Sequence, residues 1–219
     1  MVVSCWSAKG GSGTTVVAAS LALVLAQRSG PGVLLVDLAG DVPAALGMAE
    51  PAGPGVTGWA AAGSDVPADA LGRLEVPVLD ELQLLARGGD APMVPARAEL
   101  LAALLAADDR TVVVDCGTLS AGTTDGAIAV AAGANVSLLI TRACYLSLRR
   151  AVAAPIRPSA AVLVNEPGRA LDRGDVESVL GVAVSAELTV DPGVARAVDA
   201  GLLASRLPRS LQRALRDAA

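Results

Sequence analysis

The sequence predicts an α/β protein in which a doubly wound, mostly parallel sheet carries helices on both faces. Apolar segments with strand character alternate with helical segments along all 219 residues, an order typical of parallel sheets covered by helices. Apolar residues form 53% of the chain and occur as short runs of Ala, Val and Leu, as in strands buried on both faces. No long linker interrupts residues 1–219, so we expect a single domain.

The expected strands are short apolar segments that end in polar or turn residues. They cover Val2 to Trp6, Val33 to Asp37, Leu82 to Ala86, Thr111 to Asp115, Val136 to Thr141, Ala160 to Asn165 and Val182 to Glu187. The expected helices lie between them and cover Thr14 to Arg28, Arg97 to Ala107, Thr124 to Ala132, Leu146 to Ala154, Asp175 to Leu180 and Gly193 to Ala200. Two stretches rich in Gly, Pro and Ala, Leu38 to Gly63 and Gly88 to Pro95, predict loops.

The composition excludes several kinds of function. The chain has no histidine, which removes Ser-His-Asp and Cys-His nucleophile pairs and the commonest transition-metal ligand. Cys5, Cys116 and Cys144 are far apart and form no CxxC pair, so neither a disulfide framework nor a zinc site is predicted. A net charge of −5 argues against non-specific binding of nucleic acid over the whole surface.

The apolar segments are short compared with a membrane span. No uncharged apolar stretch reaches the roughly 18 residues that a bilayer requires. The segment from Met1 to Trp6 lacks the basic region and the long apolar core of a signal peptide. The sequence therefore predicts a cytoplasmic protein.

The most informative segment is Lys9-Gly10-Gly11-Ser12-Gly13-Thr14-Thr15, which lies between the first expected strand and the first expected helix. Glycines let a phosphate approach the backbone closely, and the amides at the start of a helix attract anions. Lys9 is the only lysine among seventeen basic residues, which indicates a need for a compact, strongly hydrated charge. The segment therefore predicts a phosphate-binding loop.

This loop resembles the deviant Walker A motif, KGGxGK[ST], of the MinD/ParA family of P-loop ATPases. Lys9 matches the signature lysine, which in that family reaches across a dimer interface to the partner's nucleotide. Thr15 matches the hydroxyl that binds Mg²⁺, whereas Thr14 stands where the family has a second lysine that contacts the phosphates in cis. The resemblance implies a P-loop NTPase fold, ATP or ADP with Mg²⁺ as ligands, and a homodimer that encloses the nucleotide.

Two strand ends resemble the family's acidic segments. Asp37 matches the first carboxylate of a DxD switch segment, but Ala39 stands in place of the second, which the family uses to position or activate the attacking water. Asp115 ends a strand that resembles a Walker B strand, whose acid holds Mg²⁺ through water. The resemblance thus implies Thr15, Asp37 and Asp115 as metal-site residues. It leaves only Asp37 and the nearby Asp41 as secondary candidates for catalysis.

Two later segments resemble the adenine-binding region of the family. Asn165 ends an apolar strand, as does the Asn with which the family reads the adenine, although a turn at Glu166-Pro167-Gly168 would also use Asn. Asp191 and Pro192 resemble the loop that closes on the base. The resemblance therefore implies Asn165, Asp191 and Pro192 as adenine-binding residues.

Thr14 and Ala39 together predict weak or absent hydrolysis. A charge-assisted hydrogen bond contributes roughly 1.5–3 kcal/mol, so loss of the cis lysine is expected to weaken nucleotide binding by about ten- to a hundredfold. Loss of the second carboxylate removes another part of the phosphoryl-transfer machinery. We expect nucleotide binding to survive and turnover to be slow or lost.

The C-terminal residues 205–216 combine a Leu stripe with basic side chains. Leu207, Leu211 and Leu215 recur at i+4 spacing, as in a membrane-surface helix or in a final helix that docks on the sheet. The stripe has no Trp or Phe and offers little area for insertion, which favours docking. The basic residues are candidates for weak contact with a membrane, which would place the protein peripherally at its inner face, or with DNA; they are Arg206, Arg209, Arg213 and Arg216.

The resemblance implies an ATP-binding, dimeric positioning or partitioning factor for a septum, a chromosome or plasmid, or a pilus or secretion apparatus, with an unidentified protein partner. An alternative is a pseudo-ATPase scaffold that binds its partner without nucleotide, which Thr14 and Ala39 favour over an active enzyme. An NAD(P)-dependent oxidoreductase is a further alternative, since Asp37 suits ribose recognition. Against it, Val16 replaces the third glycine, and no His or Tyr/Lys pair serves hydride chemistry.

Overall fold

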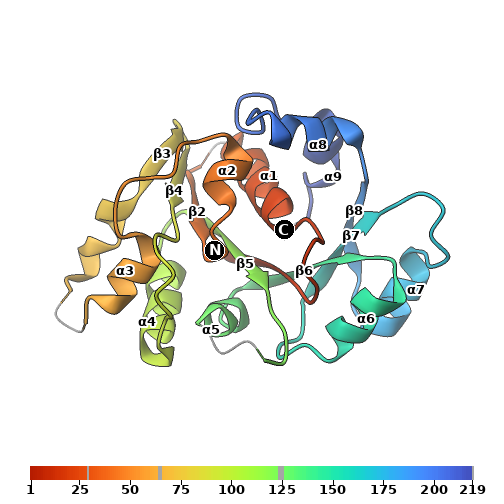
Figure 1. Cartoon of the computed structure of the whole chain (residues 1–219), viewed down its shortest axis with the longest axis horizontal. Coiled ribbons are helices and arrows are strands. Elements are labelled where there is room, and N and C mark those ends of the chain that lie inside the picture. The colour runs from red at the N-terminus through yellow and green to blue at the C-terminus, as the bar shows by residue number, and fades with distance from the viewer. Residues whose placement is uncertain (29, 64–65, 123–125, 219) are drawn as a thin grey trace.

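The computed structural model describes residues 1–28, 30–63, 66–122 and 126–218 (Figure 1). These residues form an eight-stranded sheet with the order β3-β4-β2-β5-β1-β6-β7-β8. Neighbouring strands are parallel, except that β3 and β4 form an antiparallel hairpin. The strands are β1 (Val2–Ser7), β2 (Val33–Asp37), β3 (Val76–Leu79), β4 (Leu82–Leu85), β5 (Thr111–Thr118), β6 (Val136–Arg142), β7 (Ala160–Asn165) and β8 (Val184–Thr189).

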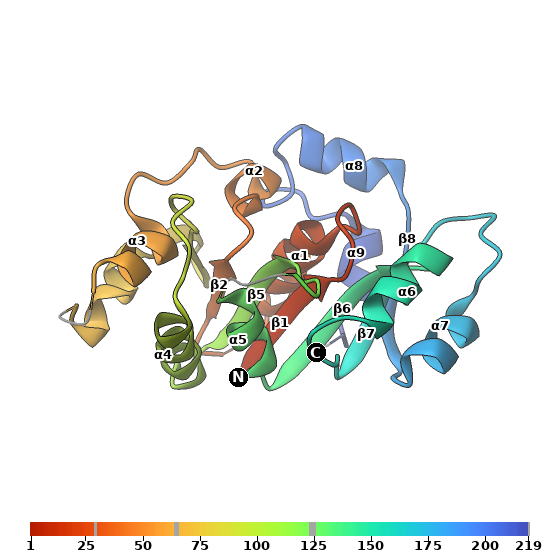
Figure 2. The same ribbon diagram turned by 60° about the horizontal axis from the view of Figure 1, so that its bottom comes forward.

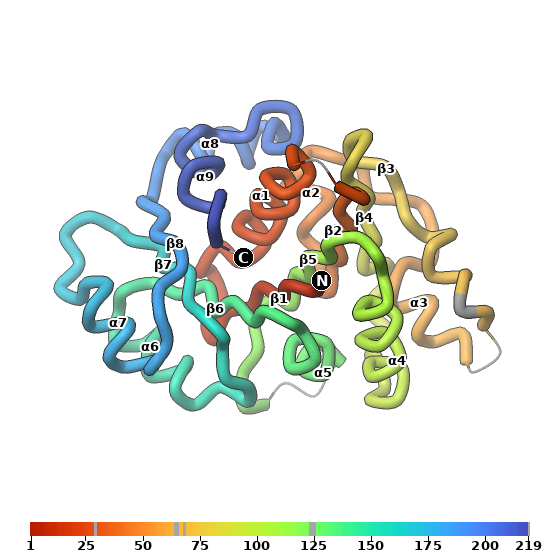
Figure 3. The backbone as a smooth tube through the Cα atoms, turned by 180° about the vertical axis from the view of Figure 1, so that it is seen from behind, coloured from red at the N-terminus to blue at the C-terminus, as the bar shows by residue number. Residues whose placement is uncertain are grey.

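Helices cover both faces of this sheet. In Figure 1, α1, α2, α8 and α9 lie above the sheet and α4, α5, α6 and α7 lie below it, and the view from behind agrees (Figure 3). The expected fold class, a doubly wound, mostly parallel sheet, is confirmed. The helices are α1 (Thr14–Ala26), α2 (Val42–Leu46), α3 (Gly55–Ala61), α4 (Pro95–Ala106), α5 (Ala127–Ala132), α6 (Tyr145–Val152), α7 (Arg173–Leu180), α8 (Pro192–Asp199) and α9 (Arg209–Ala214), with 3-10 turns at Ala68–Ala70 and Gly72–Leu74.

The side chains of β1 alternate between two hydrophobic cores on opposite faces of the sheet. Val3 and Cys5 of β1 belong to the core that contains α1, whereas Val2 and Trp6 belong to the core that contains α4 and α5. Every residue of β1 is buried. Because burial on both faces fixes β1 firmly, it also fixes where the glycine-rich loop begins.

The strand order distinguishes this sheet from a dinucleotide-binding sheet. β1 pairs with β5 and β6, and β2 is separated from β1 by β5. In the common dinucleotide-binding order the first strand pairs directly with the second. The topology therefore gives no support to the oxidoreductase alternative.

The stretch from Leu38 to Gly63 is not all loop, and this expectation was wrong in part, because the stretch contains α2 and α3. Short helices rich in Gly and Pro depend on tertiary packing. Trp59 of α3 is buried, the Cζ atom of Arg97 lies 4.1 Å from the centroid of its ring, and Arg97 donates to the Trp59 carbonyl at 2.9 Å. Figures 1 and 2 show α3 beside α4. The stretch from Gly88 to the start of α4 is irregular, as expected.

The edge strand β3 has no counterpart among the expected strands. It is four residues long, contains Pro77, and alternates between half-buried and exposed positions, so its sequence lacks the apolar run of a central strand. Pairing with β4 across the turn at Asp80 and Glu81 creates the strand. Pro is tolerated at a sheet edge because one side of the strand needs no ladder partner.

Most other elements begin within two residues of the expected position. The expected strand from Val182 begins at Val184 because Gly181, in a left-handed conformation, first ends α7. The helix expected from Asp175 begins at Arg173 because Asp172 and Asp175 form a capping box. The helix expected from Thr124 begins, within the described residues, at Ala127, and Thr124 lies outside them.

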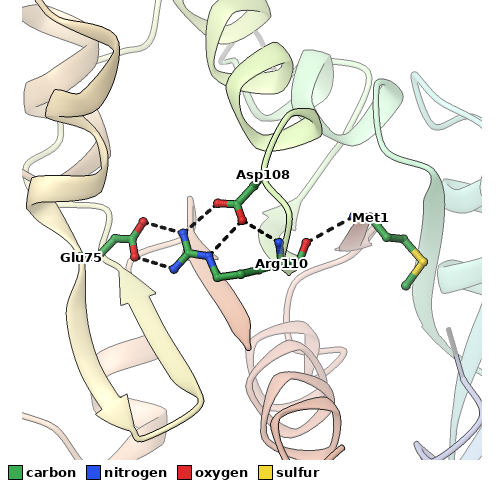
Figure 4. A network of polar contacts seen from close by, with 4 residues as sticks. All are labelled: Met1, Glu75, Asp108 and Arg110. Atoms are coloured by element: carbon green, nitrogen blue, oxygen red, sulfur yellow. Dashed lines mark hydrogen bonds and ion pairs between the residues drawn. The ribbon is translucent and has the colours of Figure 1, made fainter. Parts of the chain in front are cut away.

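A charged network ties the β3–β4 hairpin to the start of β5 (Figure 4). The guanidinium of Arg110 donates to both carboxylate oxygens of Glu75, at 2.7 and 2.8 Å. It also donates to Asp108 at 2.7 and 3.0 Å, and its carbonyl accepts from the amino group of Met1 at 3.3 Å. Bidentate pairing fixes orientation as well as adding energy, so Arg110 positions the edge hairpin against the centre of the sheet.

Candidate functional site

A cavity of about 510 Å³ lies where β1, β2 and β5 reach their carboxyl ends. Open α/β sheets bind ligands along this edge. Four segments provide the lining, namely the phosphate loop with the start of α1, the turn after β2, the residue Arg87 after β4, and the end of β5. The lining residues are Ser7, Gly10, Gly11, Ser12, Gly13, Thr14, Thr15, Val16, Leu38, Ala39, Asp41, Arg87, Cys116, Gly117 and Thr118.

The loop between β1 and α1 is shaped for contact through its backbone. Gly11 and Gly13 have φ values of 75° and 89°, and no atom lies within 4 Å of the place that a Cβ would take at either residue. The Ser12 hydroxyl donates to the Lys9 carbonyl at 2.8 Å and closes the loop on itself. No side chain caps α1. The first amides of α1 are therefore left for an anion.

Thr14 and Thr15 open α1 and line the cavity. Thr14 is 7% exposed, and its short side chain brings no positive charge to the cavity. Thr15 is half-buried and interacts with the carboxylate of Asp115. The structure thus brings together the hydroxyl and the acid expected at a Mg²⁺ site.

Asp115 lies in β5, is fully buried, and has one carboxylate oxygen without a hydrogen-bond partner among the described residues. Its Oδ1 accepts from the Gly117 amide at 3.0 Å, while its Oδ2 has no hydrogen-bond partner among the described residues. Burial raises the pKa of Asp115 to about 6, the charge of Asp37 adds to this rise, and the Thr15 hydroxyl and the Gly117 amide oppose it. A divalent cation would favour the charged form.

The described residues contain no group of three or more Cys, Asp or Glu side chains placed to hold a metal ion. The pair formed by Thr15 and Asp115 is consistent with Mg²⁺, which keeps several waters and takes few protein ligands beside substrate phosphates. These two residues fit an ion that arrives with a nucleotide.

Asp37, also expected at the metal site, is fully buried at the end of β2 and engages both of its oxygens locally. Oδ1 accepts from the amides of Ala39 at 2.9 Å and Gly40 at 2.6 Å, and Oδ2 accepts from Val42 at 3.1 Å. Burial raises the pKa of Asp37, and these three hydrogen bonds act in the opposite direction. Asp37 therefore anchors the turn that leads into α2, and it does not line the cavity.

The turn after β2 presents Ala39 and Asp41 to the cavity. The methyl group of Ala39 cannot position a water by charge. Asp41 precedes α2, but its carboxylate caps no amide of this helix, so it is available to a ligand.

Arg87 is a site residue that the sequence analysis missed. It follows β4 and donates from Nη1 to the Ala39 carbonyl at 3.0 Å, and it lines the same cavity. The sequence held one signal that could have identified it: Arg87 directly follows the expected strand from Leu82 to Ala86, and residues at the carboxyl ends of parallel strands line this edge of the sheet.

Lys9 begins the loop but does not line the cavity. Its ammonium group makes one long contact, to the carbonyl of the next residue, Gly10, at 3.5 Å.

The expected adenine-binding residues are not among those that line this cavity. The side-chain amide of Asn165 donates to Glu187 at 2.7 Å. Asp191 caps α8 by accepting from Gly193 at 2.7 Å and accepts from Ser210 at 3.0 Å, and Pro192 is the first residue of α8. Base recognition by these residues stays a prediction, and Asp191 also serves the structure by joining α8 to α9.

The Leu stripe of the C-terminal segment packs against the protein. Leu211 and Leu215 are buried in the core that contains α1, and Leu207 packs against it. This arrangement is the docked helix that the sequence analysis favoured. Arg206, Arg209, Arg213 and Arg216 stay exposed. Among the described residues, no helix is both long and apolar enough to cross a membrane.

Comparison with solved structures decides the fold. A ParA family ATPase from Chlorobium tepidum TLS superposes with a TM-score of 0.77 at 19% identity, over 99% of this chain and 96% of that one. The chain has the MinD/ParA fold. A chain of the MinC:MinD cell division protein complex of Aquifex aeolicus gives a TM-score of 0.78 at 17% identity, over 99% of this chain and 93% of that one. The septum site-determining protein MinD of Pyrococcus horikoshii OT3, complexed with Mg-ADP, gives 0.75 at 17% identity over the same shares.

No protein-family profile and no curated protein sequence matches this chain. The MinD/ParA fold is thus recognisable from the backbone, while the sequence shares fewer than one residue in five with the solved relatives above. In this fold the cavity lies beside the loop in which Lys9 to Thr15 resemble the deviant Walker A motif.

Proposed function

We propose that this chain is a single-domain protein that binds ATP and ADP and acts as a dimeric positioning or partitioning factor, with slow or absent hydrolysis. The observation that carries the proposal is the uncapped start of α1, where Gly11 and Gly13 leave open space beside backbone amides. A polyphosphate suits such a site because many amides can donate to it at once. The MinD relative complexed with Mg-ADP supports the same ligand class.

Thr15 and Asp115 are the residues that would hold Mg²⁺, Thr15 through its hydroxyl and Asp115 through water. The buried Oδ2 of Asp115, which has no partner among the described residues, supports this assignment. When bound, Mg²⁺ neutralises part of the phosphate charge. Asp37 would contribute indirectly, because its hydrogen bonds hold the turn that carries Ala39 and Asp41.

Slow hydrolysis follows from what the cavity lacks. Thr14 supplies no charge to the transition state, and Ala39 cannot orient a water. Asp41 lines the cavity with an uncommitted carboxylate and is the remaining candidate for a residual reaction.

The dimer would form around the nucleotide, with Lys9 of each copy reaching the phosphates bound by the other. The position of Lys9 outside its own cavity supports this arrangement. Because MinD is found in complex with MinC, we also expect a protein partner for this chain. The exposed C-terminal arginines are the surface that we assign to a weak membrane or DNA contact.

The second candidate function is a scaffold that binds its partner whether or not nucleotide is present. Thr14 and Ala39 favour it, since both replace groups that an active ATPase needs. The two functions differ in whether nucleotide controls the dimer.

The decisive experiment titrates ATP and ADP with Mg²⁺ by calorimetry and follows molecular mass by light scattering. We expect binding with a Kd in the micromolar range and a mass that doubles with ATP. Lys9→Ala should abolish the dimer and leave binding to the monomer within a few fold of the parent. Arg157→Ala, which changes an exposed basic residue before β7 at the opposite edge of the sheet, is the matched control and should behave like the parent.

If neither nucleotide binds at millimolar concentration, the nucleotide-binding function is wrong and the scaffold function takes its place. A phosphate-release assay on the same samples tests the second half of the proposal. Robust turnover would contradict the roles assigned to Thr14 and Ala39.

A further inference from the structure

The charge of the cavity comes from few side chains. Among the described residues that line it, Arg87 is the only basic one and Asp41 the only acidic one. Asp37 and Asp115 add two buried carboxylates beside it. A triphosphate in the cavity would therefore meet one carboxylate and one guanidinium, with two further carboxylates buried behind the lining, and the position of that guanidinium decides whether the chain can hold the ligand.

Arg87 reaches the cavity because of the sheet register. β4 lies parallel to β2 with Leu85 opposite Val36, so the residues that follow β4 emerge beside the turn that follows β2. Nη1 donates to the Ala39 carbonyl at 3.0 Å. The stem of Arg87 passes over Gly40, whose φ is 104° and whose Cβ, if it had one, would stand 3.3 Å from the Arg87 Cδ. The absence of a side chain at Gly40 thus gives the stem its path.

Several N–H groups of the Arg87 guanidinium have no strong hydrogen-bond acceptor among the described residues. An arginine has five N–H donors, of which Nη1 serves Ala39. Nη2 lies 3.7 Å from Asp90, a fully exposed carboxylate, and such a pair contributes little in water. Nε is buried and has no partner among the described residues. A planar cation with unmet donors is the group best suited to bind a phosphate through two hydrogen bonds.

We propose that Arg87 is the cis cation for the nucleotide phosphates, in place of the lysine that Thr14 does not supply. The inference rests on the proposed function, since it names the residue that makes nucleotide binding possible at the same site. A cation at this position would let a loop without its second lysine bind ATP. Because Arg87 holds the Ala39 carbonyl as well, the same side chain joins the ligand to the turn after β2.

The test measures the Kd of Mg-ATP by calorimetry for the parent and for Arg87→Gln. Glutamine removes the charge, and because its amide nitrogen ends where Arg87 has Nε, it also gives up the hydrogen bond from Nη1 to the Ala39 carbonyl. We expect Arg87→Gln to weaken binding by about tenfold or more and to reduce the dependence of Kd on salt. Arg87→Lys should recover part of the affinity. Asp90→Ala, which removes only the exposed ion pair, should bind at least as tightly as the parent.

A rescue experiment separates the supply of charge from a role in holding the turn. In the Arg87→Gln background, Thr14→Lys restores the family lysine and should bring the Kd to within about threefold of the parent, a larger gain than Thr14→Lys gives alone. Two outcomes would overturn the assignment of Arg87 and leave the proposed function intact. In the first, the parent binds nucleotide and Arg87→Gln binds within twofold of it. In the second, Thr14→Lys gives the same gain in affinity in both backgrounds. A parent that binds no nucleotide overturns both.

Discussion

Asp37 and Asp115 are two buried carboxylates with different surroundings. Asp37 accepts three backbone amides, whereas Asp115 accepts one and leaves Oδ2 without a partner among the described residues. A buried carboxylate with many amide donors is part of the structure, since each donor would lose its partner if the acid were replaced. A buried carboxylate with a spare oxygen is available to a ligand.

This contrast gives a prediction for two isosteric variants at pH 7.5. Asp37→Asn should lower the free energy of unfolding by about 1–3 kcal/mol, because its new NH₂ group would face the Val42 amide, and this loss outweighs the removal of a charge whose pKa burial also raises. Asp115→Asn should leave that free energy equal or raise it, since burial holds the pKa of Asp115 near 6 and the variant removes a charge that is costly at higher pH. Urea denaturation measures both, and the reverse ranking would contradict the assignment.

Among the elements, the β3–β4 hairpin depends on the network of Glu75, Arg110 and Asp108. Side-chain hydrogen bonds from Arg110 lower the pKa of Asp108, with burial opposing them. A lowered pKa means that the folded state favours the charged form. The stabilisation is therefore complete above the ordinary Asp value of 3.8 and is lost as the pH falls through the lower folded value.

The resulting prediction concerns Asp108→Asn. At pH 7 it should lower the free energy of unfolding by about 0.5–1 kcal/mol, and the difference from the parent should disappear as the pH falls below 3.8. Urea denaturation from neutral pH down to the most acidic pH at which the chain stays folded provides the measurement. Asp109→Asn, at an exposed neighbour of the same charge, is the control. A difference that grows in acid would contradict the role of Asp108.

The contact between α2 and the segment after α8 depends on Gly47 and Gly201, and Gly181 at the end of α7 provides a comparison. Gly47 ends α2 with φ 77°, and a Cβ there would lie 1.9 Å from the carbonyl oxygen of Gly201. Gly181 ends α7 with φ 68° and has no atom within 4 Å of the same place. The two positions share a backbone conformation and differ in available space.

Alanine at these two sites should therefore act differently. Gly181→Ala should cost about 1 kcal/mol for the left-handed conformation alone. Gly47→Ala should cost a further 1–3 kcal/mol or so because the backbone of Gly201 has to move. Thermal and urea unfolding of the two variants give the comparison, and equal losses would show that α2 and α8 separate easily.

The elements that sequence reasoning found are those with strong local signals, and those it missed depend on distant partners. β1, β2 and β5 are buried strands rich in Val, Leu and other apolar residues, and the glycine loop after β1 has the composition of a phosphate-binding loop. α3 forms because Trp59 is buried against α4, and β3 because β4 offers an edge. A sequence pattern read over one or two dozen residues does not identify such distant partners.

For the whole molecule, nucleotide binding should raise the thermal midpoint of unfolding, because a ligand that binds only the folded state stabilises it. A protein saturated at about 100 times its Kd gains roughly 2.7 kcal/mol, and for a chain of this length this shifts the thermal midpoint by about 5–10 °C. We expect this rise for Mg-ATP at millimolar concentration. Differential scanning calorimetry with and without nucleotide measures it.

Removal of the metal separates its share of the stabilisation. With EDTA, or in Thr15→Ala, the rise produced by ATP should become smaller, and Mg²⁺ without nucleotide should shift the midpoint by less than about 1 °C, because Mg²⁺ sites depend on substrate phosphates. A full rise without metal would remove Thr15 and Asp115 from the proposed site.

Site residues that directly follow one strand were predictable from the sequence, whereas those placed by the pairing of two strands were not. Thr14, Thr15 and the glycines reach the cavity as expected because they follow β1 directly. Arg87 arrives from another strand, and only the pairing of β4 with β2 places it over Ala39. The turn-anchoring hydrogen bonds of Asp37 were equally hidden, since they join residues that a motif comparison treats as spacers.

Lys9 offers a chemically distinct amine beside the phosphate loop. It is the only lysine in the sequence, and it lies next to the cavity without lining it. Apart from the terminal amine, an amine-directed dye or cross-linker can therefore modify just one place, at the edge of the sheet where the phosphate loop lies. Lys9 thus provides one side-chain position for a fluorescent probe or cross-linker beside the phosphate loop, and labelling there requires no engineered cysteine.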